Sequence, residues 1–311
     1  MKRLLVVATG TLLSFVICIG LIAAMLLTAR SAYAGPLGDG NVNQTLNATS
    51  NATVRVNNIA GSVTVRGWGN NQVQVTGTVR GGVRLDLHGS AGDIEVRAVY
   101  PQISQNDASA ELIIQVPAAS RLSVGTVSAN IQVSGLNGSA QLNSISGDVR
   151  LDSHADNISG RSVSGDVTIS GSAKGAHVSG HSISGDVRIS GVDGDVDAGS
   201  VSGSVQVNAS RLDRAKLGST SGNLSFAAGL AKSGSYDFNS TSGNLTLSFP
   251  QTPDARFDLS SFSGDIDNNF GPKAQRTSEY GPGRELHFTS GAGSAQVTAH
   301  TLSGNITLHA S

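Results

Sequence analysis

The chain has 311 residues, of which 14% are charged, 4% are aromatic and 39 are glycine, and its formal net charge is −1. This near-neutral balance argues against a nucleic-acid-binding protein, and the single cysteine excludes a disulfide framework and a cysteine-based zinc site. Glycine does not recur at every third residue, so the chain is not collagen-like.

The chain begins with a segment typical of export signals. Lys2-Arg3 precedes an uncharged, mostly apolar run over residues 4–27, and Ala32-Tyr33-Ala34 follows as a small-x-small cleavage motif. We therefore predict a signal peptide over residues 1–34. The apolar run is also long enough to span a bilayer, so an uncleaved signal anchor is the alternative. In both cases the rest of the chain is exported, to the periplasm or the cell surface.

Cleavage would change the composition of the chain. The segment carries three positive charges and no negative ones, so its loss takes the net charge from −1 to −4. It also contains Cys18, the only cysteine. The exported part can therefore enter an oxidising compartment without disulfide chemistry.

The pattern of residues in the first part of the exported chain predicts antiparallel strands. We expect residues 35–50 to be a flexible N-terminus. Residues 51–118 hold alternating apolar and polar stretches, for example 61–65 and 111–116, separated by turn-forming residues. This pattern predicts an N-terminal β-meander or cap region.

One eight-residue motif recurs eight times after that region. It reads Ser-x-Ser-Gly, with Thr for the first Ser in one copy, then Asp, Asn or Ser and an aliphatic residue. Its glycines lie at 147, 165, 185, 203, 222, 243, 264 and 304, which are 18–21 residues apart except for a last step of 40. Alternation within each copy places Val187 inside and Arg188 outside. We expect the motif's serines at an outer corner, and its glycine to allow a bend because glycine tolerates positive φ.

A period of about 20 residues with two short strands cannot bury its apolar face alone, but stacked periods can. We therefore predict an all-β protein in which a parallel β-solenoid over residues 119–311, with about 18–21 residues per rung, follows the N-terminal β-meander or cap. No window after the signal shows a 3.6-residue apolar stripe, so essentially no helix is expected. Equivalent positions would form an inward ladder of Val149, Val167, Val187, Val205, Leu224, Leu245 and Ile266.

Larger side chains fill the later rungs, where the step lengthens to 21 residues. We expect these side chains to be core rather than a ligand cage: Phe226, Phe238, Phe249, Phe257, Leu259 and Phe262. The long step after Gly264 contains residues 270–284, with two prolines and several charges. We expect this excursion to cap the last rung, at about 305–309, whose edge would otherwise be free. A solvated side loop is the alternative.

Several motifs together resemble those of the bacterial putative-adhesin family. They are the segment 61–68, which ends Arg-Gly-Trp, the step 114–117, the repeated motif, and the Tyr-Gly-Pro-Gly-Arg segment over 280–288. The resemblance covers roughly residues 50–308. It implies a β-solenoid body and an envelope location, and it supplies no catalytic residue because the family is an exported β-strand-repeat domain of unknown function.

Three acidic residues occupy the same motif position on successive rungs: Asp148, Asp166 and Asp186. Such a carboxylate ladder is one way to bind Ca²⁺. A turn-forming role fits better, because later copies carry serine or asparagine there. The stretch 193–197 starts like an EF-hand loop, but the glycine comes late and Ser204 stands where the closing glutamate belongs.

No other cluster indicates a catalytic, cofactor or metal site. His177 and His181 have the spacing of a metal pair on a helix, and that spacing loses its meaning in a strand. We predict a non-enzymatic envelope or surface protein, an adhesin or binding scaffold without cofactors. Its partner would be an envelope protein, a polysaccharide or a surface ligand. It would be a monomer with no stable membrane span after signal cleavage. The alternatives are a carbohydrate-active β-helix enzyme, which requires paired acids and stacking aromatics, and a self-assembling solenoid.

Overall fold

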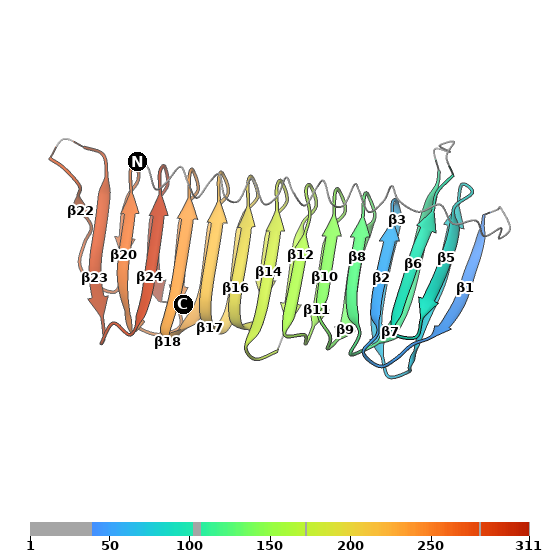
Figure 1. Ribbon diagram of the computed structural model, residues 1–311. Helices are drawn as coiled ribbons and strands as arrows, with labels where there is room; N and C mark the ends of the chain where they lie inside the picture. The colour runs from blue at the N-terminus through green and yellow to red at the C-terminus, as the bar shows by residue number, and fades with distance from the viewer. Residues whose placement is uncertain (1–38, 102–106, 172, 280, 311) are drawn as a thin grey trace.

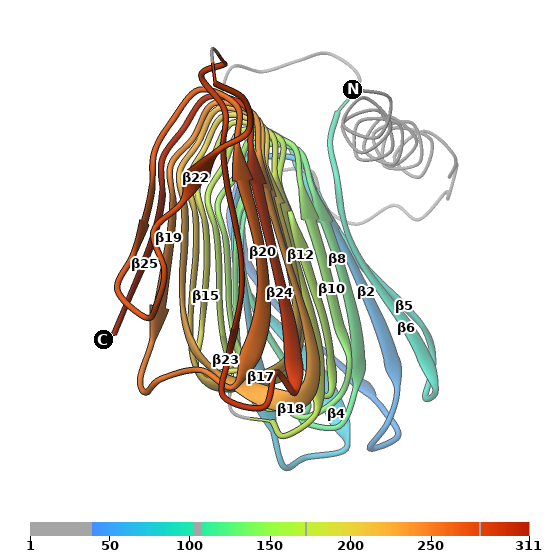
Figure 2. The same ribbon diagram turned by 90° about the vertical axis from the view of Figure 1, so that its left-hand side faces the viewer.

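The structure, a computed structural model, describes residues 39–101, 107–171, 173–279 and 281–310. Every regular element in these ranges is a β-strand, so the prediction of an all-β protein is confirmed. The strands stand side by side in a long row (Figure 1), and an end-on view shows two walls facing each other (Figure 2). The predicted signal peptide, residues 1–34, lies outside the described residues. Within the described ranges, no helix is long and apolar enough to cross a membrane.

We call the two walls sheet 1 and sheet 2. In spatial order, sheet 1 contains β5 (Arg84–Ser90), β6 (Asp93–Val99), β2 (Thr53–Asn58), β8 (Arg121–Thr126), β10 (Ala140–Ser144), β12 (Asn157–Arg161), β14 (Ala176–Ser182), β16 (Asp193–Ser200), the second halves of β17 (Val205–Ser219) and β18 (Leu224–Ser240), β24 (Ala295–Thr301), β20 (Ala255–Ser261), β23 (Arg284–Ser290) and β22 (Gln275–Arg276).

Sheet 2 contains, in the same direction, β1 (Gly40–Asn47), β4 (Gln72–Arg80), β7 (Ser109–Pro117), β3 (Gly61–Trp68), β9 (Asn130–Leu136), β11 (Val149–Ser153), β13 (Val167–Gly171), β15 (Val187–Ser190), the first halves of β17 and β18, β19 (Leu245–Phe249), β25 (Ile306–Ala310) and β21 (Ile266–Asn268). Strands β17 and β18 pass from one wall to the other and join the two sheets.

The middle of the stack follows the predicted parallel ladder. Val149 pairs with Val167, and the series continues through consecutive rungs to Leu245. All of these side chains are buried. Each motif copy therefore contributes one parallel rung, and the fold is β-solenoid-like.

At the C-terminal end, the order of the rungs in space differs from their order in the sequence. Leu245 pairs with Ile306, and Ile306 in turn pairs with Ile266. Strands β24 and β25 thus insert between the rung of β18 and β19 and the rung of β20 and β21. The expectation that residues 305–309 form an exposed last rung is wrong, because β25 is paired on both sides. The step of 40 residues is the excursion that adds the outer rung before the chain returns.

The excursion itself lies at the end of the stack, as expected. Residues 275–276 form β22 and residues 284–290 form β23, and β23 pairs antiparallel with the outermost parallel strand, β20. An antiparallel partner ends the parallel repeat, because the next rung would have to run in the same direction as β20.

The N-terminal end is built in the same interleaved way. Strand β2 pairs in parallel with both β6 and β8, and β3 pairs in parallel with both β7 and β9. Residues 53–68 are therefore a rung inside the stack, not part of a cap that precedes it. The expected hairpin pairing is present in β5–β6, and β4 pairs antiparallel with β7 and β1. Residues 40–47, placed in a flexible segment from sequence, form β1.

The core changes in width along the stack. In the narrow segment, β10 to β16, the inner face of sheet 1 carries Gly160 and Gly180, and a Cβ at Gly180 would lie 3.1 Å from Val187 of the opposite wall. In the wide segment, β17 to β20, the rings of Phe226 and Phe238 meet across the core with centroids 4.9 Å apart. The structure confirms the predicted aromatic core with one exception.

That exception is Phe262, which is 60% exposed. It occupies the second position of its motif copy, within the turn that joins the two walls. Side chains at this position point away from the core, and Leu302 on the adjacent rung is exposed for the same reason. The strand alternation used for prediction does not continue through this turn.

Candidate binding surface

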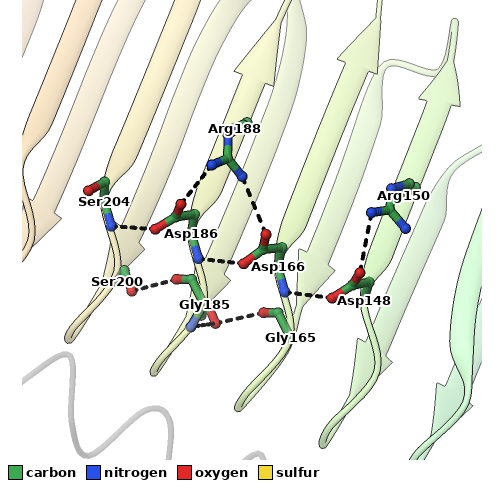
Figure 3. Close-up of polar contacts among 10 residues, drawn as sticks. Asp148, Arg150, Gly165, Asp166, Gly185, Asp186, Arg188, Ser200 and Ser204 are labelled. Atoms are coloured by element: carbon green, nitrogen blue, oxygen red, sulfur yellow. Dashed lines mark hydrogen bonds and ion pairs between the residues drawn. The ribbon is translucent and has the colours of Figure 1, made fainter.

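The repeated motif forms the turn along one long edge of the stack, and its first serine is buried there. Ser200 accepts a hydrogen bond from the backbone N–H of Gly203, 3.0 Å away. It donates to the carbonyl of Gly185 on the previous rung, 2.9 Å away, and Figure 3 shows this second bond. The expectation that the motif's serines lie outside is wrong for this position. The buried residues are Ser144, Ser162, Ser182, Ser200, Ser219, Ser240, Ser261 and Thr301.

The motif glycine is required by close stacking. A Cβ on Gly185 would lie 2.2 Å from the carbonyl oxygen of Gly165, and one on Gly222 would lie 1.9 Å from that of Gly203. None of the eight motif glycines has a positive φ. The expected reason, backbone freedom in the left-handed region, is therefore wrong, and the real constraint is the approach of the neighbouring rung.

The acidic ladder belongs to the same edge. The backbone N–H of Asp186 donates to Asp166 Oδ1 over 2.9 Å, and Ser204 N–H donates to Asp186 Oδ1 over 2.8 Å. Arg188 holds the remaining carboxylate oxygens of Asp166 and Asp186, at 3.4 and 2.7 Å (Figure 3). Asp148 accepts the N–H of Asp166 in the same way. Each carboxylate thus links its turn to the turn of the next rung, so the expected role in closing its own turn is wrong. The amide oxygens of Asn223 and Asn244 make the same contact in later copies.

The other acidic and histidine motifs lie in strands. Residues 193–197 begin β16 and do not form a calcium-binding loop. His177 and His181 lie on β14 and point outward from sheet 1, roughly 13 Å apart at 3.3 Å per residue. Among the described residues, no group of three or more His, Cys, Asp or Glu side chains could hold a metal ion.

Charges gather instead on the outer face of sheet 1, across β12 to β17. We call this group the charged strip: Arg161, His177, His181, Asp195, Asp197, Arg214 and Lys216. His177, Asp195 and Arg214 stand directly opposite one another on three neighbouring strands. Arg214 binds Asp195 through two bonds, of 3.1 and 2.5 Å, and His177 Nδ1 lies 4.0 Å from the same carboxylate. The parallel register thus turns residues distant in sequence into one polar row.

His181 is the most enclosed member of the strip. The neighbouring strand of the same sheet, β16, places Gly199 directly beside His181. A Cβ on Gly199 would lie 3.1 Å from His181 Nδ1. Burial lowers the pKa of His181, Asp197 at 3.8 Å opposes that shift, and Arg161 and Lys216 reinforce it. The ring therefore favours its neutral form.

A hollow of about 300 Å³ adjoins the strip at the edge where β16, β17 and β18 turn. Three glycines contribute to its wall, so much of that wall is backbone, and the charged groups around it are Asp195, Asp213, Arg214 and Lys232. Asp195 is paired with Arg214, and Asp213 with Arg211. Lys232 has no hydrogen bond or ion pair within the described part of the chain. The hollow therefore holds one cation beyond its ion pairs.

The bend within β18 that carries Lys232 is fixed by hydrogen bonds. The buried hydroxyl of Tyr236 accepts a hydrogen bond from the N–H of Ala231, 2.8 Å away, and donates to the carbonyl of Leu212. Burial raises the pKa of Tyr236, so the phenol remains a neutral donor. Ser233 has a φ of 63° and donates its N–H to Ser294, 3.0 Å away. The lysine thus projects from a fixed bend.

A second hollow, of about 310 Å³, lies on the outer strands β20 and β23. Phe257 and Phe288 stack there with centroids 4.6 Å apart, and His287 Nδ1 lies 3.1 Å from Asp258. Both hollows are at the small end of the range for small-molecule sites.

Sequence reasoning did not find the first hollow. Its charged groups come from three rungs, and a register shift between Gly194 and Asp195 is needed to set Asp195 opposite Arg214. The one available signal was the charge-rich stretch 211–216, which interrupts the serine- and glycine-rich repeats.

We compared the chain with known protein families. The family model described as Toastrack DUF4097 matches residues 43–309. The chain belongs to this family. Toastrack proteins have a β-solenoid-like fold, in agreement with the paired rungs, and the predicted membership of an adhesin-type family of unknown function is thereby confirmed. No curated protein matches the chain.

Several solved structures are similar to the chain at low sequence identity. A protein from Parabacteroides distasonis described as a putative lipid binding protein is 11% identical, with a TM-score of 0.47, over 87% of this chain and 96% of that one. A putative adhesin from Bacteroides fragilis is 10% identical, with a TM-score of 0.42, over 86% and 97%. A second P. distasonis protein, also described as a putative adhesin, is 9% identical, with a TM-score of 0.42, over 88% and 97%.

Proposed function

We propose that this Toastrack protein is an exported, non-enzymatic binding scaffold of the bacterial envelope, built on a parallel β-solenoid of about 18–21 residues per rung. Its ligand is a polysaccharide that carries acidic substituents. The binding surface is the charged strip together with the hollow around Lys232. The N-terminal segment 1–34, with its basic start, apolar run and Ala-x-Ala motif, supports export to the periplasm or cell surface.

One observation carries the choice of ligand. Lys232 is an unpaired cation on a fixed bend beside an Arg214–Asp195 pair and a wall of backbone groups. An acidic substituent would pair with the lysine, and sugar hydroxyls would exchange hydrogen bonds with the carboxylates and the exposed backbone. Flat strands at about 4.8 Å spacing offer such contacts in a repeating row, which suits an extended polymer.

The same surface gives no support to the rival enzymatic reading. The acidic groups of the hollow, Asp195 and Asp213, are each held by an arginine. Glycoside hydrolysis requires two carboxyl groups that both face the scissile bond, one of them as a general acid, and here both carboxylates are engaged by arginine side chains. We therefore propose binding without turnover.

The test is direct binding to immobilised envelope polysaccharides, acidic and neutral, with Lys232→Ala and Arg214→Ala as site variants. We expect the acidic polymers to bind, and each variant to weaken binding roughly tenfold, which corresponds to the loss of one charge-assisted hydrogen bond. Arg188→Ala is the matched control, because it removes an exposed arginine that is also paired with aspartate, but on the outer face of sheet 2, and should leave binding unchanged.

Two results would overturn the proposal. One is the absence of binding to any acidic polymer, and the other is an equal loss in Arg188→Ala. A shortening of the polymer during incubation, measured by size-exclusion chromatography, would show turnover and favour the enzymatic alternative.

A further inference from the structure

We propose that two copies of this protein join end to end through β1, which pairs antiparallel with β1 of the second copy about a twofold axis at Gln44. This inference is independent of the ligand and replaces the sequence-based expectation of a monomer. It concerns the end of the stack that contains β1 and β5, at the right of Figure 1.

Strand β1 is an open edge. Among the described residues it pairs only with β4, so its other side has no strand partner. Six of its eight residues are exposed, and only Val42 and Leu46 are partly covered, by packing against the core. In an antiparallel strand, alternate residues direct both N–H and C=O away from the existing partner. An exposed edge of this length is a template for pairing with another chain.

The composition of β1 distinguishes it from the other strands at the ends of the stack. Its sequence is Gly-Asn-Val-Asn-Gln-Thr-Leu-Asn, without a charge or a proline. Each of the other terminal strands carries at least one charged residue: β5, β21, β22 and β23. Charged residues and proline are the usual means of blocking an edge, and β1 has neither.

One register of self-pairing satisfies both the backbone and the side chains. With Gln44 opposite its own copy, Val42 stands opposite Leu46, and Asn43 opposite Thr45. In this register even-numbered residues stand opposite even-numbered ones, and odd opposite odd. The N–H and C=O groups that point away from β4 on one copy therefore face those of the other copy. Val42 and Leu46 lie on the inner face, so the pairing would continue the apolar face across the axis. Asn43, which accepts a hydrogen bond from Gln74 on the outer face, would meet a hydroxyl.

The two ends together predict a closed dimer rather than a filament. At the far end, β23 carries Arg284, Glu285 and His287, and the preceding excursion contributes Pro272 and Lys273. An antiparallel pairing about a twofold axis uses the same surface on both copies and leaves no second open end. Assembly therefore stops at two.

Cysteine cross-linking tests this register. The protein is produced with its own N-terminal segment and a Cys18→Ser change, so that the sequence has no other cysteine. Gln44→Cys then places two thiols directly opposite at the axis, where antiparallel Cα atoms are about 4.5–5.5 Å apart, within the range of a disulfide. Asn43→Cys is the matched control, because its own copy would lie diagonally, beyond roughly 7 Å.

We expect most of the Gln44→Cys protein, and little of the Asn43→Cys protein, to run as a disulfide-linked dimer after mild oxidation. Circular dichroism should show unchanged β-structure in both. Equal cross-linking of the two variants would overturn the register, and absence of cross-linking in Gln44→Cys would overturn the dimer.

A charge exchange gives a second, independent test. Gln44→Lys and Gln44→Glu each place like charges directly opposite at the axis, which destabilises the pair. In sedimentation velocity each variant alone should lose the dimer, and an equimolar mixture should recover it. A mixture that stays monomeric, or single variants that remain dimeric, would contradict the proposal.

Discussion

The narrow and wide segments of the stack share one edge and differ in what fills them. Along the motif edge, the glycines of both segments touch the carbonyl of the neighbouring rung in the same way. On the inner face of sheet 1, the row Gly160, Gly180 and Ala198 of the narrow segment continues as Leu217 and Phe238 in the wide one. The motif therefore fixes how rungs stack, and the core side chains fix how far apart the walls stand.

This division of roles makes the aromatic fill the most sensitive part of the wide segment. Phe238→Ala should destabilise the protein by about 3–5 kcal/mol, because it opens a cavity against Phe226. The corresponding change in the narrow segment, Gly180→Ala, adds a methyl group whose neighbours need to move only slightly. Its cost should stay below about 1 kcal/mol. Chemical denaturation of both variants measures the contrast, and a larger loss in Gly180→Ala would show that the narrow walls cannot yield.

The shared edge should respond alike in both segments. Gly185→Ala in the narrow segment and Gly222→Ala in the wide one each force a Cβ to within about 2 Å of a backbone carbonyl. Overpacking of this kind typically costs about 1–3 kcal/mol, and the two losses should agree within about 0.5 kcal/mol. Thermal melts provide the measurement. If the two losses of stability differ by more than this, the distance between the walls also determines how closely the rungs stack at the motif edge.

The buried motif serines of the narrow and wide segments should differ in how much they stabilise the protein. Ser182 accepts from Gly185 N–H at 2.9 Å and donates to the Gly165 carbonyl at 3.0 Å. Within the described residues, the one hydrogen bond of the Ser240 hydroxyl is from the Gly243 N–H, at 2.8 Å. Ser182→Ala leaves two buried backbone groups without this partner and should cost about 2 kcal/mol. Ser240→Ala should cost about 1 kcal/mol. Denaturation midpoints that fall in the opposite order would contradict the assigned hydrogen bonds.

The repeats were readable from sequence because each copy carries its own register. The ladder from Val149 to Leu245 required only the motif spacing and strand alternation. That reasoning failed where local alternation stops, at the turn positions of Ser200 and Phe262. Their burial depends on how adjacent turns stack, and this is a contact between rungs rather than a property of one rung.

The two ends and the binding surface depend on longer-range choices. Nothing local distinguishes a rung that follows its predecessor from one that inserts before it, so the place of β24 between β18 and β20 was not predictable. The hollow around Lys232 likewise needs the register shift between β16 and β17 and the bend at Ser233. Such features follow from the pairing of whole strands, which sequence spacing alone does not fix.

The smallest expected effect concerns the pH dependence of the narrow segment. In the outer row of sheet 1, His181 of the narrow segment is followed by Gly199, Gly218, Asn239 and then His300. Among these residues, His181 is the one whose pKa is lowered by burial. Because burial holds the pKa of His181 below its ordinary value of 6.5, the unfolded chain takes up a proton that the folded chain resists.

His181 therefore contributes stability that is present above about pH 6.5 and is lost as the pH falls toward the lower folded pKa. The wild-type protein should lose stability between pH 7 and pH 5, and His181→Asn, which places in the narrow segment the residue found at position 239, should lose less over that interval. Melting temperatures across the series give the measurement, with Arg188→Ala as a control because the arginine that it removes does not titrate in this range. Parallel curves for the wild type and His181→Asn would mean that Asp197 offsets the combined effect of burial, Arg161 and Lys216 on the pKa of this ring.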